Sequence, residues 1–117
     1  YVALKGTEVV GWGSLSLWSD RCAYSETAET SFYVKASEQG QGIGKLLLKT
    51  LDQSAMQLKF HSLVSRITEE SAASIHLHKV FGFHQAGVLK EVGLKFGKLL
   101  SVCLMQKIYG RSDERQK

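Results

Sequence analysis

Three glycines at alternate positions, Gly40, Gly42 and Gly44, are followed at once by Lys45 and by an amphipathic stretch. A chain that passes from strand to helix through bare glycines exposes backbone N–H groups at the positive end of the helix dipole. Glycines also let a diphosphate come within hydrogen-bonding distance of those groups. The stretch therefore predicts a phosphate cradle to which Lys45 adds positive charge. A glycine-rich turn without a ligand remains the alternative.

Two other phosphate-binding motifs do not fit this stretch. A P-loop requires glycine at position 39 and Ser or Thr at position 46, where the chain has Gln39 and Leu46. The dinucleotide fingerprint GxGxxG, started at Gly40, requires a third glycine at position 45, where the chain has Lys45. The predicted phosphate cradle is therefore neither a P-loop nor a dinucleotide fingerprint.

The elements that must position the cradle are strands and helices, which the sequence distinguishes by hydrophobic periods of about 2 and about 3.6 residues. Lys5-Gly6-Thr7 reads as a hairpin turn, Ser71 as a helix N-cap and Gly82 as a left-handed helix stop. A crossover helix between the third and fourth strands indicates that these two strands are parallel. The result is an α/β fold with one mixed sheet in a single domain over 1–109, followed by a polar tail over 110–117. The expected strands cover 2–4, 9–18, 28–35, 62–67, 83–92 and 99–108, with helices over 43–59 and between Ser71 and Gly82.

Composition narrows the class of protein. The chain has 117 residues, 44% of them hydrophobic and 22% charged, which suits one soluble globular domain. A net charge of +4 favours an anionic partner, but the dispersed basic residues argue against nucleic acid, and no apolar run is long enough for a membrane. Cys22 and Cys103 lack a CxxC spacing, so we expect a reducing, cytoplasmic setting.

The segment VKASEQGQGIGKLLL resembles motif A of the GNAT superfamily of acetyl-CoA-dependent N-acetyltransferases. That motif, Q/R-x-x-G-x-G/A, is filled by Gln39, Gly42 and Gly44. SIHLHKVFGF looks like the second motif of the superfamily. AETSFYVKASEQGQGIG and LKEVGLKFGKLLSVCLMQK resemble the phosphinothricin N-acetyltransferase-like subgroup. The resemblance implies a GNAT-like acyltransferase fold, and also an N-terminal strand and two helices that this chain lacks.

The resemblance implies acetyl-CoA as the cofactor and assigns its binding mostly to the backbone. The end of the third strand would pair with the pantetheine arm, and an N–H group there would polarise the thioester carbonyl. Ser71 stands where the subgroup usually has Asn. The residues implied for the cofactor are Phe32, Tyr33, Val34, Gln39, Gly40, Gln41, Gly42, Ile43, Gly44, Lys45 and Ser71.

Two residues are candidates for proton transfer. Glu29 matches the carboxylate that the subgroup uses as general base; the alternatives are a solvated strand residue, or Glu26 in the preceding loop as the base. His78 matches the position of a proton donor to the leaving thiolate, whereas a histidine between apolar neighbours is also typical of a packed core residue. His76 lies on another helical face, so the pair is not a helical metal site, and we expect no metal.

The acceptor is predicted from the loop WSDRCAY and the subgroup. Arg21 would bind a substrate carboxylate, while Trp18 and Tyr24 would wall the acceptor. The predicted function is N-acetylation of a small amino acid or analogue, such as phosphinothricin or methionine sulfone, by direct attack in a ternary complex. The alternatives are another amine (an aminoglycoside, a polyamine or a protein terminus), a CoA-binding module without turnover, or an interaction protein. We also expect a homodimer through the C-terminal hairpin.

Overall fold

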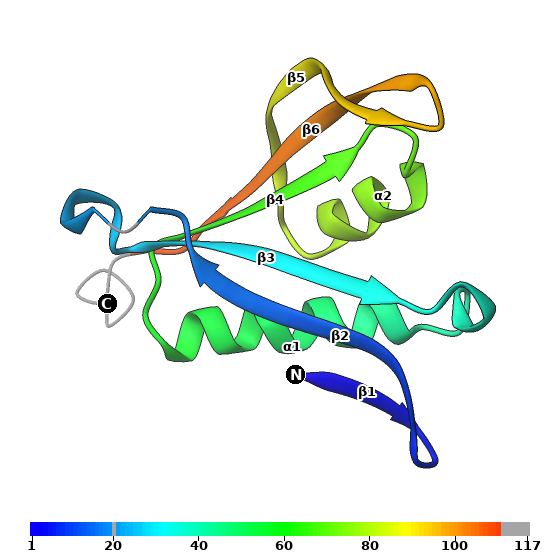
Figure 1. Cartoon of the computed structure of the whole chain (residues 1–117). Helices are drawn as coiled ribbons and strands as arrows, with labels where there is room; N and C mark the ends of the chain where they lie inside the picture. The colour runs from blue at the N-terminus through cyan, green and yellow to red at the C-terminus, as the bar shows by residue number, and fades with distance from the viewer. Residues whose placement is uncertain (20, 111–117) are drawn as a thin grey trace.

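The computed structural model describes residues 1–19 and 21–110 and contains one mixed sheet with two α-helices (Figure 1). The strand order is β1-β2-β3-β4-β6-β5. The predicted tail over 110–117 falls, apart from Gly110, outside the described residues. In the described part of the chain, no helix combines the length and apolar character that a membrane span needs. The strands are Val2–Lys5, Glu8–Leu17, Thr27–Val34, Ser62–Thr68, His84–Lys95 and Lys98–Ile108, with α1 over Ile43–Gln57, α2 over Ala72–Val80 and short 3-10 turns η1 over Cys22–Tyr24 and η2 over Ala36–Glu38.

Strands β3 and β4 are parallel, as the crossover helix predicts, but they pair only at their beginnings. The last paired residues are Thr30 of β3 and Ser65 of β4. Beyond them β3 continues along β2, whereas β4 continues along β6. The two strands therefore diverge, and Figure 1 shows the V-shaped opening between their ends.

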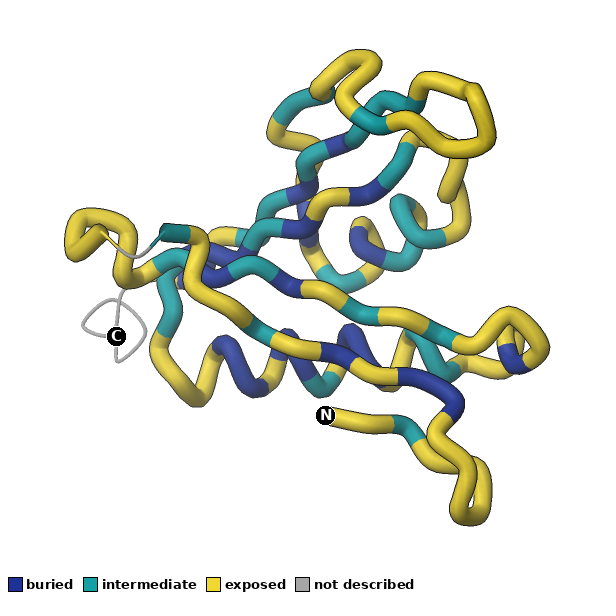
Figure 2. The backbone as a smooth tube through the Cα atoms, viewed as in Figure 1, coloured by how far each residue is buried: buried dark blue, intermediate teal, exposed yellow. Residues whose placement is uncertain are grey.

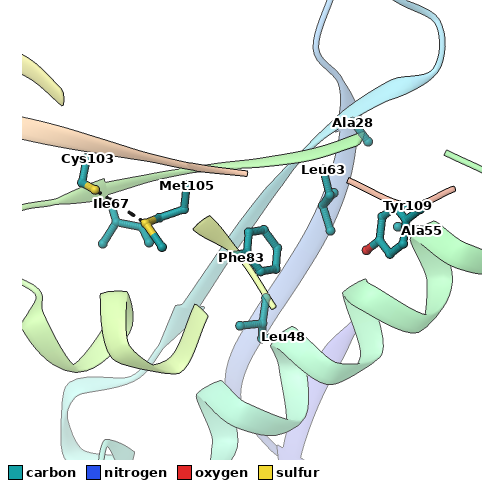
Figure 3. Close-up of a cluster of buried hydrophobic side chains, with 9 residues drawn as sticks. All are labelled: Ala28, Leu48, Ala55, Leu63, Ile67, Phe83, Cys103, Met105 and Tyr109. Atoms are coloured by element: carbon teal, nitrogen blue, oxygen red, sulfur yellow. Dashed lines mark hydrogen bonds between the residues drawn. The ribbon is translucent and has the colours of Figure 1, made fainter. Parts of the chain in front are cut away.

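Helix α1 covers one face of this sheet because its apolar residues form a single stripe. Leu47, Leu48, Leu51 and Ala55 are buried. Figure 2 shows buried segments recurring along α1 between exposed ones. Leu48 and Ala55 pack with strand residues into one hydrophobic core (Figure 3). Residues of α2 pack against the same core, so both helices lie on one face. The other members of that core are Ala28, Leu63, Ile67, Phe83, Cys103, Met105 and Tyr109.

Helix α2 ends as predicted but is capped differently. Gly82 has a φ of 90°, the left-handed conformation expected of a helix stop. Ser71 occupies the N-cap position, yet its side chain makes no capping hydrogen bond. Its hydroxyl is instead hydrogen-bonded to Thr68 Oγ1 at 3.1 Å. The predicted N-cap position is therefore confirmed, while the hydroxyl that would usually cap the helix is engaged by the end of β4.

The C-terminal hairpin is longer than the sequence predicts. Strand β5 runs to Lys95 and β6 starts at Lys98, so only Phe96 and Gly97 form the turn. Both residues have positive φ, 51° and 76°, which is the geometry of a two-residue hairpin turn. Its tip is apolar and open to solvent: Phe96 is 96% exposed and Leu94 71% exposed.

The face of the sheet opposite the two helices is open. Along β3, Ala28 and Thr30 are buried under the helices, while Ser31 and Tyr33 are exposed on the other side. Tyr33 stacks on the half-exposed Trp12 of β2 with ring centroids 6.4 Å apart. Because side chains alternate along a strand, Glu29 also belongs to this open face.

Candidate active site

The predicted phosphate cradle lines a cavity of about 520 Å³ between the end of β3 and the two helices. Gly40 and Gly42 both have left-handed backbone conformations, with φ of 83° and 81°. Gly42 is the N-cap of α1 and has no side chain to bond the first N–H groups of the helix, so these remain open to a ligand. Gln41 and Ser71 do not line this cavity. The other predicted cofactor residues do: Phe32, Tyr33, Val34, Gln39, Gly40, Gly42, Ile43, Gly44 and Lys45.

A second cavity, of about 360 Å³, lies where β3 and β4 diverge. It shares Phe32 and Ser74 with the cradle cavity, so the two adjoin. Its walls come from both faces of the sheet, because alternate residues of the two strands contribute. Residues of the helix-covered side and of the open side therefore meet at this gap. The lining residues are Glu29, Thr30, Ser31, Phe32, Ser65, Arg66, Ile67, Thr68, Ser71, Ser74 and His78.

On the open side of this gap Glu29 forms an ion pair. Its Oε2 atom lies 2.9 Å from Nε of Arg66, the residue that follows the last paired position of β4. The Glu29 side chain is 22% exposed and that of Arg66 is 56% exposed. The Arg66 guanidinium also lies over the ring of Trp18, with Cζ 5.3 Å from the ring centroid. A half-buried carboxylate thus faces the gap beside a more exposed cation.

On the helix-covered side His78 is almost fully buried, with 1% of its surface exposed. Its Nδ1 lies 2.7 Å from the carbonyl oxygen of Ser74, and its Nε2 lies 2.9 Å from Oγ of Ser65. Burial lowers the pKa of His78 and favours the neutral ring. A carbonyl only accepts, so Nδ1 carries the proton and Nε2 accepts from the Ser65 hydroxyl. Phe32 stacks on one side of the ring and Phe83 meets it edge-on.

This geometry matches the packed, hydrogen-bonded alternative for His78, although the ring also lines the gap. Both of its nitrogens are engaged within the protein, and the neutral ring presents no second N–H. Ser65 is hydrogen-bonded in turn to Thr30 Oγ1, which ties β3, β4 and α2 together at the base of the opening.

Comparison with known proteins identifies the family. The model of the acetyltransferase (GNAT) family matches residues 1–83, which is most of the chain. The chain belongs to the GNAT acetyltransferase family. GNAT relatives share its fold: a ribosomal-protein-alanine N-acetyltransferase from Brucella melitensis, 40% identical, superposes with a TM-score of 0.86 over 92% of this chain and 67% of that one.

Other relatives are named for small amino acids or their analogues. An L-methionine sulfoximine/L-methionine sulfone acetyltransferase of Pseudomonas paraeruginosa is 37% identical over 85% of this chain and 58% of its own length. A phosphinothricin acetyltransferase from Sinorhizobium meliloti, solved in complex with acetyl-CoA, is 34% identical with a TM-score of 0.87 over 93% of this chain and 60% of that one. The chain thus spans less than two thirds of the length of these two relatives.

The predicted acceptor residues of this GNAT chain are not all brought together. Trp18 and Tyr24 line a third cavity of about 270 Å³ on the open face, beside Val64 and Leu104. Trp18 also packs under the guanidinium of Arg66, which lines the gap between β3 and β4. Arg21 precedes η1 in an exposed stretch and lines none of the three cavities. Glu26, the other base considered, is exposed and lines none of them either.

Seven residues that line the gap were not among the predicted site residues: Thr30, Ser31, Ser65, Arg66, Ile67, Thr68 and Ser74. Thr30 and Ser65 are ordinary strand residues in sequence, and only the β3–β4 register brings their hydroxyl groups together. Arg66 carried one usable signal, since an arginine inside the apolar run HSLVSRI is unusual for a buried strand. That signal predicts an outward-facing position but not its partner.

Proposed function

We propose that this chain carries the acetyl-CoA-dependent N-acetyltransferase activity of its family and acetylates the free amine of a small amino acid or analogue. The observation that carries the proposal is the meeting of two cavities at Phe32 and Ser74. One is lined by a glycine loop at a helix N-terminus, and the other contains a carboxylate. A phosphorylated thioester and an amine would meet where they join.

The residues of the first cavity fit acetyl-CoA by their chemistry. The open N–H groups after Gly42 and the ammonium of Lys45 suit a diphosphate. Beyond the last paired residue Thr30, the edge of β3 that faces away from β2 has no β4 neighbour, so it can pair with an extended amide-containing arm. The Val34 carbonyl at its end accepts a hydrogen bond from the Gln39 side chain. When bound, acetyl-CoA supplies an activated acetyl thioester. The chain supplies the cradle, the strand edge and the walls that exclude water.

Glu29 is the proposed base. An amine attacks only when neutral, and an amino acid amine is largely protonated near neutral pH. The Glu29 carboxylate faces the gap and would accept that proton, directly or through water. For His78, we propose that it holds Ser65 and Thr30 in place through these hydrogen bonds.

The test is calorimetric titration with acetyl-CoA, followed in the same sample by free-thiol release in the presence of methionine sulfone. Binding with release supports the proposal. Binding without release, with this and other amines, would favour a CoA-binding module without turnover. A folded sample that does not bind acetyl-CoA would exclude the phosphate cradle and the proposed activity together.

A protein N-terminus is the second candidate acceptor. The 40% identical relative is named for acetylation of ribosomal-protein alanine, which is a peptide terminus and not a free amino acid. An alanine-initiated peptide offered beside methionine sulfone in the same assay separates the two, because only the free amino acid has a carboxylate next to its amine.

We further propose a homodimer in a reducing, cytoplasmic setting. Both cysteines are free, Cys22 exposed and Cys103 buried, and burial raises the pKa of the Cys103 thiol, which makes it a poor acetyl carrier. The exposed apolar tip of the β5–β6 hairpin, with Leu94, Phe96 and Leu99, supports pairing of two copies. Sedimentation of the wild-type chain and of Phe96→Ser tests the pairing.

A further inference from the structure

Arg66 lies at the gap between β3 and β4, where a second protein group besides Glu29 is needed to bind the acceptor. It lies one residue beyond the last paired position of β4, on the lip of the gap. Its neighbours Ser65 and Ile67 are buried under the helices, so alternation directs Arg66 to the open face, the side that carries Glu29. A cation and a carboxylate therefore share the same mouth, drawn from two different strands.

The guanidinium is held in place yet remains available to a ligand. Trp18 lies under it at 5.3 Å, which limits the orientations of an otherwise flexible side chain. Its 2.9 Å contact with Glu29 is made through Nε. A carboxylate ligand is bound best by a pair of parallel N–H groups, and a guanidinium with Nε turned towards Glu29 still has its terminal amino groups to offer. With 56% of the side chain exposed, an incoming anion can reach them.

We propose that Arg66 is a specificity-determining residue, one that binds the α-carboxylate of a free amino acid while Glu29 faces its amine. The ammonium and carboxylate groups of an amino acid sit on the same carbon and have opposite charges. The pair formed by Glu29 and Arg66 presents the complementary charges at the same mouth. A polyamine has no carboxylate to offer, and its second ammonium meets a like charge at Arg66. A peptide terminus has an uncharged amide in that position.

This inference rests on the proposed function and competes with Arg21 for the same role. Arg21 lies in an exposed stretch and lines none of the cavities at the site, whereas Arg66 lines the gap itself. A purely structural role for Arg66, in which it only orients Glu29, is the other possibility. Carboxylate binding by Arg66, carboxylate binding by Arg21 and orientation of Glu29 by Arg66 are distinguished by which acceptor loses activity when each arginine is replaced.

The experiment measures kcat and KM for methionine sulfone and for its carboxamide, which keeps the amine and lacks the carboxylate. The variants are Arg66→Gln, Arg66→Lys and the matched Arg21→Gln. We expect Arg66→Gln to lower kcat/KM for the acid roughly 10- to 100-fold, mainly through KM, and to lower kcat/KM for the carboxamide far less. Arg66→Lys keeps the charge but not the planar fork, so its loss should be intermediate.

Two results would overturn the proposal. An equal loss for both acceptors in Arg66→Gln would mean that the arginine acts only through Glu29. A selective loss of the acid in Arg21→Gln, without one in Arg66→Gln, would transfer the role to Arg21. If the wild-type chain binds acetyl-CoA but acetylates neither acceptor, the proposed function fails. In that case the role of Arg66 is tested by calorimetric binding of methionine sulfone to the CoA-loaded protein. Arg66→Gln should abolish this binding, whereas Arg21→Gln should keep it.

Discussion

The two cavities that meet at Phe32 and Ser74 are built in different ways. The cofactor half, the cavity beside Gly40 to Lys45, is made mainly of backbone: a left-handed glycine turn and the first N–H groups of α1. The acceptor half, the gap between β3 and β4, is made of side chains that two strands bring together. One half depends on where side chains are missing, and the other on which side chains are present.

This difference bears on how the two halves can vary. A backbone cradle binds the same phosphate group whatever side chains surround it, so it tolerates Gln41 and Lys45 where other phosphate motifs differ. In the proposed acceptor half, by contrast, a substitution of Glu29 or Arg66 at the mouth would change which ligand fits. Relatives of this chain are named for different acceptors, methionine sulfoximine and methionine sulfone in one and ribosomal-protein alanine in another. The predictions below separate the two halves experimentally.

The largest expected effect is on turnover alone. Glu29→Gln removes the proposed base from the acceptor half and should lower kcat by about 10²- to 10³-fold. Acetyl-CoA affinity should remain, because Glu29 does not line the cofactor cavity. Loss of the ion pair with the half-exposed Arg66 should change stability by less than about 1 kcal/mol. Glu26→Gln in the preceding loop is the matched control, measured by thiol release and calorimetry.

If Glu26→Gln lost turnover and Glu29→Gln kept it, the base would lie in the loop, and the comparison between the halves would have to be redrawn. Loss of acetyl-CoA binding in Glu29→Gln would show instead that the two halves are not independent.

The second expected effect is on the pH dependence of the free energy of unfolding, through His78 in the gap between β3 and β4. Burial lowers the pKa of His78 below that of the unfolded chain, so the unfolded state binds more protons as pH falls. Stability should therefore decline below about pH 6.5, by up to about 1.4 kcal/mol per pH unit, and His78→Gln should remove this part of the decline. Urea unfolding at several pH values checks the slope, with the same replacement at the exposed His84 as control.

Identical slopes for the wild type and His78→Gln would mean that His78 binds protons equally in the folded and unfolded chains, which contradicts a pKa lowered by burial. The folded ring could then be protonated as readily as the unfolded one, and the direct acid role for the leaving thiolate would regain support.

The cofactor half was largely predictable from sequence and the acceptor half was not, for a physical reason. Glycine spacing, helix periodicity and the crossover helix are local signals, and they correctly predict the glycine turn, α1 and the parallel pairing of β3 with β4. The gap depends on where that pairing stops, at Thr30 and Ser65, which no local pattern encodes. The contact between Glu29 and Arg66 follows from this register, so it could not be read from either strand alone.

Local signals also failed where an unusual residue takes a special conformation. The β5–β6 turn uses Phe96, a bulky residue at positive φ, in place of the Asn that commonly begins such a turn. The sequence therefore suggested a wider loop. Ser71 has the right residue type and position for an N-cap, yet the competing hydroxyl of Thr68 at the end of β4 engages its side chain. The width of the turn depends on the backbone conformation of Phe96, and the partner of Ser71 depends on the position of Thr68 at the end of β4.

The smallest expected effect isolates the backbone half from general strain. Gly42→Ala forces a Cβ into a left-handed position, which should cost about 1 kcal/mol of stability and weaken acetyl-CoA binding roughly 10-fold by moving the N–H groups that follow. Gly6→Ala imposes the same kind of strain, at φ 64°, in the β1–β2 turn. An added Cβ has no atom within 4 Å at either position, so crowding does not distinguish them. Thermal unfolding should therefore report similar losses for both variants, while calorimetry finds weaker cofactor binding only in Gly42→Ala. Equal affinities in the two variants would mean that the glycine turn serves the fold and not a phosphate.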